Sequence, residues 1–360
     1  LQAARDETAG RGVAQQDLDN AAARRKVALA QLDSANKALA LAIAGPRRED
    51  IRQAEAQLAA ARADKALADR QVEESELKAP IASVVRALAK ELQIKSKHPL
   101  LIAAELERGA GQQFSGATGL PPVAAIVALG DIEALKRAGR LTAREARTMG
   151  VNWNLAPVCD LDLLAENPVV GSRALGGDPR KVASLVTAWI ESCQAEGVLA
   201  CAKHFPGMGR VVADPSVELP SVDLPADQLK DQDLQPFRAA ISAGVASMMT
   251  AHVAYPALDS SRAPATLSRE ILQWLLRQQL KYDNLIVSDA LTMAGALHGH
   301  DIAQAAVLAL RAGCDVLLDP GELETTLDAL ERAAADGSLV PERLRQACRC
   351  RTMWGPACSA

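Results

Sequence analysis

The sequence predicts an α/β fold: a TIM-type (β/α)8 barrel in which six of the eight strands can be counted, preceded by an α-helical coiled-coil segment. Three observations support this fold class. After Lys97, short apolar runs alternate with amphipathic helical patterns, which is typical of parallel βα units. Polar side chains stand at the ends of those runs, as on the active face of such a barrel. Before Leu77, an alanine-rich stretch with almost no aromatic side chain favours long helices.

Composition narrows the class of protein further. The chain has 360 residues, of which 49% are hydrophobic, enough to fill a sizeable core. Its 40 basic and 44 acidic side chains give a net charge of −4, so the bulk electrostatics favour neither a nucleic acid nor an anionic membrane as a partner. No apolar stretch reaches about 18 residues, so no membrane span is expected. A small neutral ligand is compatible with this composition.

The cysteines and the first residues bear on the compartment. Seven cysteines are scattered without a C-x-x-C pair, and no histidine stands at metal-ligand spacing, so we expect reduced, buried thiols and no metal site. The chain begins at Leu1 inside a helical pattern, with neither a methionine nor a signal-like segment, which suggests a truncated N-terminus. A cytoplasmic location is expected, with the periplasm as the alternative.

The N-terminal part carries a coiled-coil pattern. Apolar residues with 3-4-3 spacing form a narrow stripe flanked by charge and interrupted by Lys65. Such a stripe needs a partner helix, so self-association through this segment is expected; the plainer alternative is a solvated, alanine-rich helix. Gly45-Pro46 separates this helix from an earlier one, and the chain turns or kinks there. The stripe consists of Ile51, Ala54, Leu58, Ala61, Ala68 and Val72.

Six apolar runs in the rest of the chain each resemble a buried strand, and long helical patterns such as 181–196 and 267–279 separate them. A doubly wound sheet is the alternative, but "GAGQQFSG" (109–116) opens no obvious helix and gives only a weak dinucleotide signal. The polar residues at the run ends are Glu105, Asp160, Lys203-His204, His252 and Asp289. The runs are "PLLIAAE" (99–105), "VNWNLAPV" (151–158), "GVLACAKHF" (197–205), "ASMMTAHV" (246–253), "NLIVSDA" (284–290) and "CDVLLD" (314–319).

Four motifs link these runs to a known family. They are "NPVVGSRALGGDP" (167–179), "KHFPG" (203–207), "AHVAYPALD" (251–259) and "VSDALTMAGA" (287–296). In order and spacing they resemble glycoside hydrolase family 3, specifically its β-N-acetylhexosaminidase branch, over residues 97–351. The resemblance implies a retaining mechanism without a cofactor, in which a carboxylate attacks the anomeric carbon and a second group moves the proton. It implies terminal β-linked N-acetylglucosamine, as in cell-wall fragments and peptidoglycan recycling, as the carbohydrate substrate.

The resemblance also implies roles for individual residues. Asp289 matches the family's nucleophile, although its position alone also suits a helix cap. Lys203 and His204 match a sugar-binding pair, against the alternatives of a buried ion pair and a core histidine. Arg173 matches an arginine that faces the bound sugar. Glu105 stands where the family usually has a shorter aspartate.

Further positions support the pocket. His252 and Thr266 match residues that line or brace it, and Glu107 is expected to support the loop that carries Glu105. We assign His252 to substrate binding together with Lys203, His204, Arg173 and Glu105.

The loop after "KHFPG" departs from the family. There the branch carries Asp-x-His, with the histidine as general acid/base, whereas this chain has Asp214-Pro215-Ser216. A serine hydroxyl is far too weak an acid and base to replace an imidazole with a pKa of about 6.5. Losing a positioned acid/base typically costs about 10²–10⁴-fold in rate, so impaired activity is expected. Asp214 remains, and His298, His300 and Glu218 are alternative proton carriers.

The first 80 residues resemble a different class of protein. "GVAQQDLDNA", "AIAGPRREDIRQAEAQLAAARA" and "VEESELKAP" are similar to the helical hairpin of periplasmic membrane-fusion adaptors. The predicted organisation is therefore a coiled-coil hairpin fragment at 1–80, a linker at 81–96 and a glycoside hydrolase barrel at 97–355. The hairpin stands where the family has the first two strands of its barrel, and "IASVV" (81–85) offers one short strand at most.

A second function from a different class stays open. The missing strands, Ser216 and Glu105 favour a catalytically inactive sugar-binding or fusion protein whose coiled-coil arm mediates association. The retained Asp289 and Lys203-His204 favour the hydrolase.

Overall fold

The computed structural model describes residues 22–37 and 84–352. Residues 22–37 form one helix, as predicted for this part of the chain, in a compact unit separate from the sheet. Its Lys37 and Asp33 side chains pair at 2.6 Å, one turn apart and exposed, which adds little stability. The stripe at 51–72 and most of the adaptor-like hairpin lie outside the described residues, so the hairpin and its self-association stay predictions.

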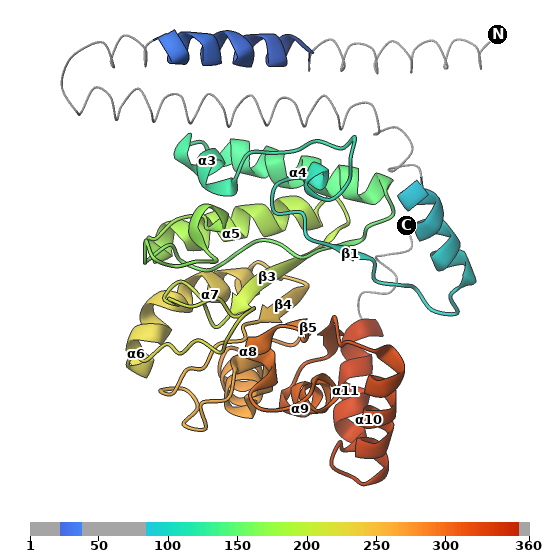
Figure 1. Ribbon diagram of the computed structural model, residues 1–360. Helices are drawn as coiled ribbons and strands as arrows, with labels where there is room; N and C mark the ends of the chain where they lie inside the picture. The colour runs from blue at the N-terminus through green and yellow to red at the C-terminus, as the bar shows by residue number, and fades with distance from the viewer. Residues whose placement is uncertain (1–21, 38–83, 353–360) are drawn as a thin grey trace. The chain divides into compact units, whose positions relative to one another are not determined.

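Six parallel strands form one curled sheet, and their order along the sheet follows their order along the chain (Figure 1). Each predicted run contains one strand, so these six predictions are confirmed. A doubly wound sheet would reverse its strand order at a switch point. This sheet contains no reversal, and that alternative is wrong. The strands are β1 (Ala103–Ala104), β2 (Trp153–Asn154), β3 (Leu199–Phe205), β4 (Ser247–Thr250), β5 (Leu285–Ala290) and β6 (Val316–Leu318).

Helices connect the strands, and α4, α5 and α7 pack side by side (Figure 1). Aspartates begin two of them: Asp131 accepts a hydrogen bond from the Glu133 amide, and Asp178 accepts from the Arg180 and Lys181 amides ahead of the helix that Pro179 opens. Within the described ranges, no helix is both long and apolar enough to cross a membrane. The α-helices are α3 (Val123–Ala128), α4 (Ile132–Thr148), α5 (Pro179–Gln194), α6 (Ala226–Gln228), α7 (Gln235–Ser242), α8 (Ala294–Leu297), α9 (Ile302–Ala312), α10 (Leu323–Ala335) and α11 (Pro341–Thr352).

Shorter or wider turns complete the connections. The helix predicted at 267–279 is the π-helix η5 (Glu270–Gln279), preceded by the 3₁₀ turn η4 (Ala265–Leu267). A second π-helical segment, η3 (Leu229–Asp233), follows α6. The 3₁₀ turns η1 (Ala110–Gln112) and η2 (Gly171–Arg173) lie in the loops after β1 and β2, where they border the site described below.

Residues 84–95 form a helix, which corrects the expectation that "IASVV" supplies a strand. Val84, Leu88 and Leu92 recur every four residues, a helical rather than a strand period. This helix packs closely on the turn after α4, because a Cβ atom at Gly150 would lie 2.6 Å from the Cβ atom of Ala89.

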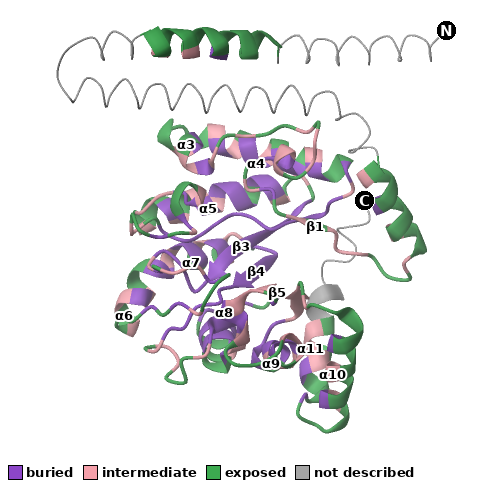
Figure 2. Ribbon diagram, viewed as in Figure 1, coloured by how far each residue is buried: buried purple, intermediate pink, exposed green. Residues whose placement is uncertain are grey.

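A hydrophobic cluster runs across the strands, and hydrogen bonds of the buried Trp153 and Ser247 side chains lie within it. The Trp153 indole donates to the Ser247 hydroxyl (2.7 Å), and that hydroxyl donates to the Ala200 carbonyl (3.0 Å). Figure 2 shows β3 and β4 buried, while much of α10 is exposed. The fully buried members of the cluster are Trp153, Leu155, Leu199, Cys201, Ala246, Met249 and Val287.

The sheet ends at two edges. Among the described strands, β1 pairs with β2 alone and β6 pairs with β5 alone. A closed barrel needs two further strands between these edges, and those first two strands have no counterpart in residues 84–352. The sheet is therefore a half-barrel whose strands all end on the same side, where the polar run ends gather.

Candidate active site

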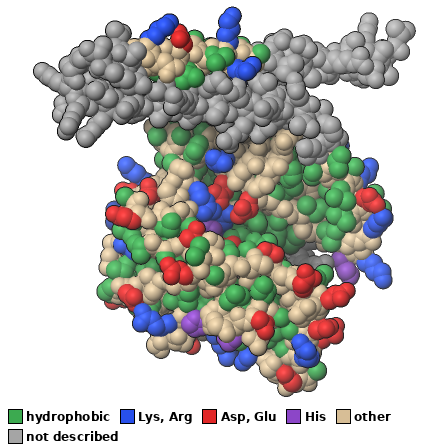
Figure 3. Space-filling model, viewed as in Figure 1, with side chains coloured by type: hydrophobic (Ala, Val, Ile, Leu, Met, Phe, Trp, Pro, Cys, Tyr) green, Lys and Arg blue, Asp and Glu red, His purple; other side chains and the backbone are tan. Residues whose placement is uncertain are grey.

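A cavity of about 380 Å³ opens at the carboxyl ends of the strands. Figure 3 shows acidic, basic and histidine side chains gathered in a hollow on this face. Asp289, His204, Arg173 and Glu105 line the cavity together with Glu107, so the structure brings four of the eight predicted site residues to one cavity. Further polar residues of the lining are Arg108, Gln112 and Ser172, and its apolar side chains are those of Val169, Met208, Pro215 and Met293.

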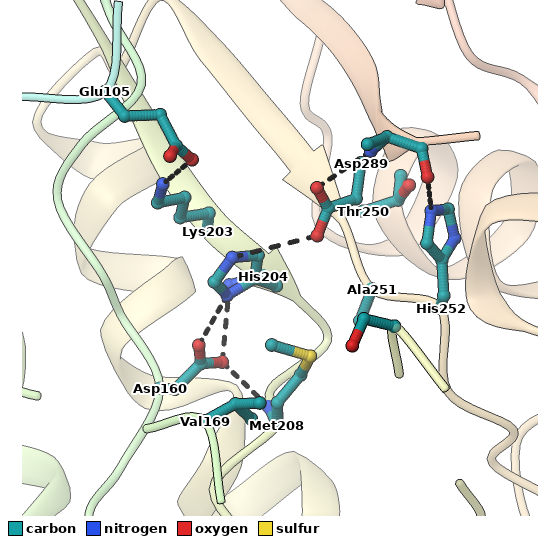
Figure 4. Close-up of polar contacts among 12 residues, drawn as sticks. Glu105, Asp160, Val169, Lys203, His204, Met208, Thr250, Ala251, His252 and Asp289 are labelled. Atoms are coloured by element: carbon teal, nitrogen blue, oxygen red, sulfur yellow. Dashed lines mark hydrogen bonds and ion pairs between the residues drawn. The ribbon is translucent and has the colours of Figure 1, made fainter. Parts of the chain in front are cut away.

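One wall of the cavity is a network of four charged side chains. Lys203 Nζ lies 2.8 Å from Glu107 Oε1 and 2.9 Å from Glu105 Oε1 (Figure 4). Arg173 donates to both oxygens of Glu107, from Nε at 2.9 Å and from Nη2 at 2.8 Å. This bidentate geometry fixes the guanidinium plane as well as its distance. Lys203 is therefore a buried ion-pair partner that lies behind the cavity wall and holds the two carboxylates that line it.

Burial and charge act in opposite directions on this network. Burial alone raises the pKa of Glu107, but the hydrogen bonds and charges of Arg173 and Lys203 lower that pKa well below its usual range. Burial lowers the pKa of Lys203, yet the neighbouring Glu107 and Glu105 carboxylates raise it above its ordinary value. Glu107 and Lys203 therefore stay charged at neutral pH, with Glu107 (9% exposed) between two cations.

Buried hydrogen bonds position the loop that carries Arg173. The Asn167 side-chain oxygen accepts from the amides of Val169 and Val170, both at 3.0 Å, and its amide nitrogen donates to the Met208 carbonyl at 2.7 Å. These contacts shape the "NPVVGSR" turn so that η2 presents Arg173 to Glu107.

His204 is oriented by a buried carboxylate. Its Nδ1 lies 2.7 Å from Asp160 Oδ2, while Asp160 Oδ1 accepts from the Met208 amide at 2.7 Å (Figure 4). A carboxylate oxygen accepts, so Nδ1 carries a proton and Nε2 faces the cavity. Nε2 lies 3.9 Å from Asp289 Oδ2. The imidazole therefore borders the space beside Asp289.

Asp289 lies near the end of β5 with its two oxygens in different environments. Oδ1 accepts the Ala290 amide at 2.8 Å, and Oδ2 faces His204 beyond hydrogen-bond distance. Burial raises the pKa of Asp289, but His204 and the Ala290 amide are among the groups that lower it below the ordinary value, so the carboxylate is ionised. The helix-cap alternative receives no support, because α8 begins at Ala294 with Met293 at its cap position.

His252 lies behind the cavity wall. It is fully buried and does not line the cavity. Its Nε2 is 3.0 Å from the Ala290 carbonyl oxygen, and its Nδ1 is 2.8 Å from Thr266 Oγ1. Burial lowers the pKa of His252 more than the nearby Asp289 charge raises it. The structure thus places His252 against the main chain next to Asp289, away from the position of a bound sugar.

The loop that carries Asp214 and Ser216 reaches the cavity through Pro215. Asp214 Oδ1 accepts a hydrogen bond from the Ser216 amide at 2.8 Å, so this carboxylate stabilises the turn in which it lies. Ser216 is exposed, and neither it nor Asp214 lines the cavity. Of the other suggested proton carriers, Glu218, His298 and His300 are exposed and none lines the cavity.

Two residues are more central than the sequence indicated. Glu107 was expected only to support its loop, yet it joins Lys203 to Arg173. Asp160 was noted at a strand end without a role, yet it orients His204. The sequence signal for Glu107 was its spacing, because Glu105 and Glu107 follow a strand two residues apart. In the fold, both carboxylates meet Lys203, a buried cation that needs a counter-charge.

Comparison with known proteins agrees with this geometry. A family model described as "Glycosyl hydrolase family 3 N terminal domain" matches residues 53–351. A "Beta-hexosaminidase" of Thiobacillus denitrificans is 39% identical over 268 residues, covering 72% of this chain and 74% of the relative. A "Beta-N-acetylglucosaminidase/beta-glucosidase" of Cellulomonas fimi is 35% identical over 280 residues, covering 75% of this chain and 50% of the relative.

Solved structures give the same result. A family 3 β-N-acetylglucosaminidase from a Paenibacillus species matches with a TM-score of 0.74 and 34% identity, over 77% of this chain and 54% of that one. A β-N-acetylhexosaminidase from Beutenbergia cavernae matches with a TM-score of 0.66 and 31% identity, over 78% of this chain and 85% of that one. The chain thus spans about half the length of the Cellulomonas and Paenibacillus proteins.

Proposed function

Because this chain belongs to glycosyl hydrolase family 3, a family of glycosidases, we propose that it is a retaining β-N-acetylhexosaminidase-like hydrolase that removes terminal β-linked N-acetylglucosamine. The observation that carries the proposal is Asp289. Its ionised carboxylate is fixed at the end of β5 by one oxygen and faces the cavity with the other. The names of the relatives from Thiobacillus and Paenibacillus support the choice of sugar.

In the first step, Asp289 Oδ2 attacks the anomeric carbon. A new carbon–oxygen bond forms to the carboxylate, the glycosidic bond breaks, and its electron pair leaves with the aglycone oxygen. In the second step, water attacks the same carbon, releases Asp289 and gives up a proton. Two inversions at one carbon retain the β configuration. Oδ2 suits this role because its lone pairs are not used by an amide donor, whereas those of Oδ1 are.

The charged wall suits the hydroxyl groups of a sugar. The carboxylates of Glu105 and Glu107 can accept hydrogen bonds from sugar hydroxyls. The Arg173 guanidinium can donate to a hydroxyl, and His204 presents its Nε2 atom to a neighbouring one. Glu105 is the adaptable member, because its side chain is 48% exposed whereas that of Lys203 is fully buried. We therefore place the non-reducing end of the sugar at Glu105 and Arg173, with Lys203 holding Glu105 from behind, and the anomeric carbon at Asp289.

Proton transfer is the weak part of this site. Ser216 supplies no imidazole, and the Asp214 carboxylate is engaged by the Ser216 amide. The leaving oxygen must then take its proton from water. We therefore expect hydrolysis mainly of glycosides whose leaving groups are weak bases, with about 10²–10⁴-fold slower hydrolysis of ordinary alkyl glycosides than an intact acid/base would give.

The second candidate is a protein that binds the same sugar without turnover. Ser216 favours it, because this residue is exposed and does not line the cavity. Its suggested association through the coiled-coil arm falls outside the described residues and stays a prediction.

One experiment separates the two functions. The purified chain is incubated with 2,4-dinitrophenyl and methyl β-N-acetylglucosaminide, and phenol release and the first sugar anomer are followed by absorbance and NMR. The hydrolase proposal predicts release from the dinitrophenyl substrate, β-anomer first, with little release from the methyl glycoside. An Asp289→Asn variant is the control and releases nothing. Sugar binding by calorimetry without any release would establish the binding protein instead.

A further inference from the structure

Three buried side chains behind Asp289 form a continuous hydrogen-bond chain. Thr250 Oγ1 lies 2.7 Å from Thr266 Oγ1, Thr266 Oγ1 lies 2.8 Å from His252 Nδ1, and His252 Nε2 lies 3.0 Å from the Ala290 carbonyl oxygen. All three side chains are fully buried. Figure 4 shows His252 directed at the main chain beside Asp289 from the side opposite His204.

The chemistry of the groups fixes the direction of these bonds. A carbonyl oxygen only accepts, so His252 Nε2 carries a proton and donates it to Ala290. Because burial keeps the imidazole neutral, Nδ1 has no proton and accepts from the Thr266 hydroxyl. Thr266 Oγ1 also lies 3.1 Å from the Ala251 carbonyl oxygen, so its one proton is shared between that carbonyl and His252 Nδ1, and its lone pair accepts from the Thr250 hydroxyl. Thr266 therefore ties the His252 imidazole to the main chain of Ala251, and His252 in turn donates to Ala290.

The Ala290 carbonyl accepts two hydrogen bonds, one from His252 Nε2 at 3.0 Å and one from the Met293 amide at 3.1 Å. The ladder between β4 and β5 ends at the pair Met249 and Val287, and on the other side the β5–β6 register shifts between Val287 and Ala290, which pairs with Leu318. His252 therefore supplies a side-chain donor at the point where β5 has left its pairing with β4.

The main chain of Ala290 is thus held at both of its polar groups. His252 donates to its carbonyl, and its amide donates to Asp289 Oδ1 at 2.8 Å. We propose that Thr250, Thr266 and His252 are positioning residues for the nucleophile: they fix Ala290, which fixes Oδ1 and leaves Oδ2 directed at the anomeric carbon. This inference rests on the proposed function, because it gives the three side chains a task in the attack by Asp289.

The experiment compares how fast the nucleophile is labelled after a buried threonine hydroxyl is removed, either at Thr266 or at a control position. The whole chain is labelled with an activated 2-deoxy-2-fluoro glycoside, and the rate of adduct formation is measured over a range of reagent concentrations. Thr266→Val removes the donor to His252. It is expected to lower the maximal labelling rate about 10–100-fold while the half-saturating concentration changes less than about twofold, since a misdirected nucleophile slows the chemical step alone. Thr266→Ser restores the hydroxyl and recovers most of the lost rate.

Thr142→Val is the matched control. Thr142 is also buried, but its hydroxyl donates only to the Ala138 carbonyl within α4. If both valine variants label like the wild type, or slow equally, the positioning role is overturned. If the wild type itself gives no adduct, the proposed function fails, and that result is distinct because it needs no variant.

A second readout does not depend on turnover. Nitrogen-15 NMR of the imidazoles should show His252 of the wild type as a neutral Nε2–H tautomer at about pH 7, with its pKa below that of a free imidazole because the side chain is buried. Thr266→Val should shift its Nδ1 resonance. An Nδ1–H tautomer, or an ordinary titration, would overturn the proposed direction of the chain.

Discussion

At the scale of single residues, the role of each carboxylate in the site depends on which hydrogen-bond partners its two oxygens have. Asp289 has one oxygen bonded to an amide and one free, and Asp160 uses both of its oxygens to hold His204 and Met208. The first carboxylate can attack because it keeps a free lone pair. The second can only orient its neighbour, so the same chemical group has two roles that are set by its partners.

Ser216→His tests whether the missing acid/base limits turnover. An imidazole beside the Asp214 carboxylate would supply the proton to the leaving oxygen, so turnover of methyl β-N-acetylglucosaminide should rise about 10–10²-fold. Turnover of the dinitrophenyl substrate should change little, because that leaving group needs no proton. Val217→His, at the neighbouring exposed position, is the control and should gain nothing. Equal gains in both variants would show that the position itself is irrelevant.

Glu107 gives a prediction for pH and stability. Its pKa is lower in the folded chain than in the unfolded chain, so its stabilising contribution is complete above about pH 4.3, and it is lost as the pH falls through the lowered folded value. Glu107→Gln leaves the buried Lys203 with the half-exposed Glu105 as its remaining carboxylate partner and removes the bidentate partner of Arg173, and it should cost about 3 kcal/mol at pH 7. Urea unfolding of both proteins between pH 7 and pH 2.5 should show this difference shrinking on acidification.

The control for this measurement is Glu133→Gln. Glu133 pairs with Lys136 on the surface of α4, where water screens the charge, so its loss should leave the urea midpoint unchanged. A difference for Glu107→Gln that stays constant down to pH 2.5 would contradict the charged network.

The sequence predicted which residues gather but not what each contacts. Asp289, Lys203, His204 and Glu105 stand at strand ends, and parallel strands bring their carboxyl ends together, so their meeting follows from the pattern alone. The direction of a side chain does not. His252 also follows the end of a strand, yet it faces the main chain at Ala290. That carbonyl comes within reach only in the folded sheet, beyond the last β4–β5 pair, where it accepts from both His252 and the Met293 amide.

At the scale of elements, the beginning of α8 holds the loop of Ser216. The Ala294 and Gly295 amides donate to the carbonyls of Ser216 (3.3 Å) and Pro215 (2.9 Å). Gly295 permits this approach, because a Cβ atom there would lie 2.8 Å from the Pro215 oxygen and 3.0 Å from the His252 oxygen. A glycine is therefore required where the acid/base loop, α8 and the His252 segment meet.

Gly295→Ala should push this loop away and destabilise the chain by about 1–3 kcal/mol. It should also slow labelling of Asp289, since the main chain at His252 moves with the loop. Gly119→Ala, in open space, is the control and should change stability by less than about 0.5 kcal/mol. Thermal unfolding and labelling rates provide both measurements, and an unchanged Gly295→Ala protein would show that the loop is not docked as described.

Element types were predictable, and element lengths were not. The apolar runs located every described strand, yet β1 and β2 have only two paired residues inside runs of seven and eight. Pairing depends on the neighbouring strand, which a single run does not contain. The π-helical winding of η5 was equally hidden, because its buried Ile271, Leu272, Leu275 and Leu276 fit an ordinary helical spacing.

At the scale of the whole molecule, the open edges decide how the sheet behaves. The central strands β3 and β4 have a partner on each side, whereas β1 and β6 have one described partner each. In hydrogen exchange followed by mass spectrometry, amides of β3 and β4 should therefore exchange at least about 10²-fold more slowly than those of β1 and β6. Edge amides as protected as those of β3 would show that the edges are paired in solution.

The half-barrel was predictable because six runs fall short of the eight strands that close a barrel. The structure that precedes β1 could not be predicted, because the alanine-rich sequence contains no strand pattern to place at the open edge. The one run suggested for a strand there was "IASVV", and its last two residues belong to the helix at 84–95. The central residues of the site do not depend on the two strands that a closed barrel would add. Asp289, His204 and Lys203 come from β3 and β5, and both strands have a neighbour on each side.

The most direct measurement is the mass and position of the covalent intermediate. The chain is incubated with an activated 2-deoxy-2-fluoro glycoside, weighed intact and digested for peptide mapping. We predict one sugar per chain, attached to Asp289 and absent from a folded Asp289→Asn variant. A sugar on any other residue, or no adduct on a chain whose circular dichroism shows it folded, would contradict the assignment of Asp289 as the nucleophile.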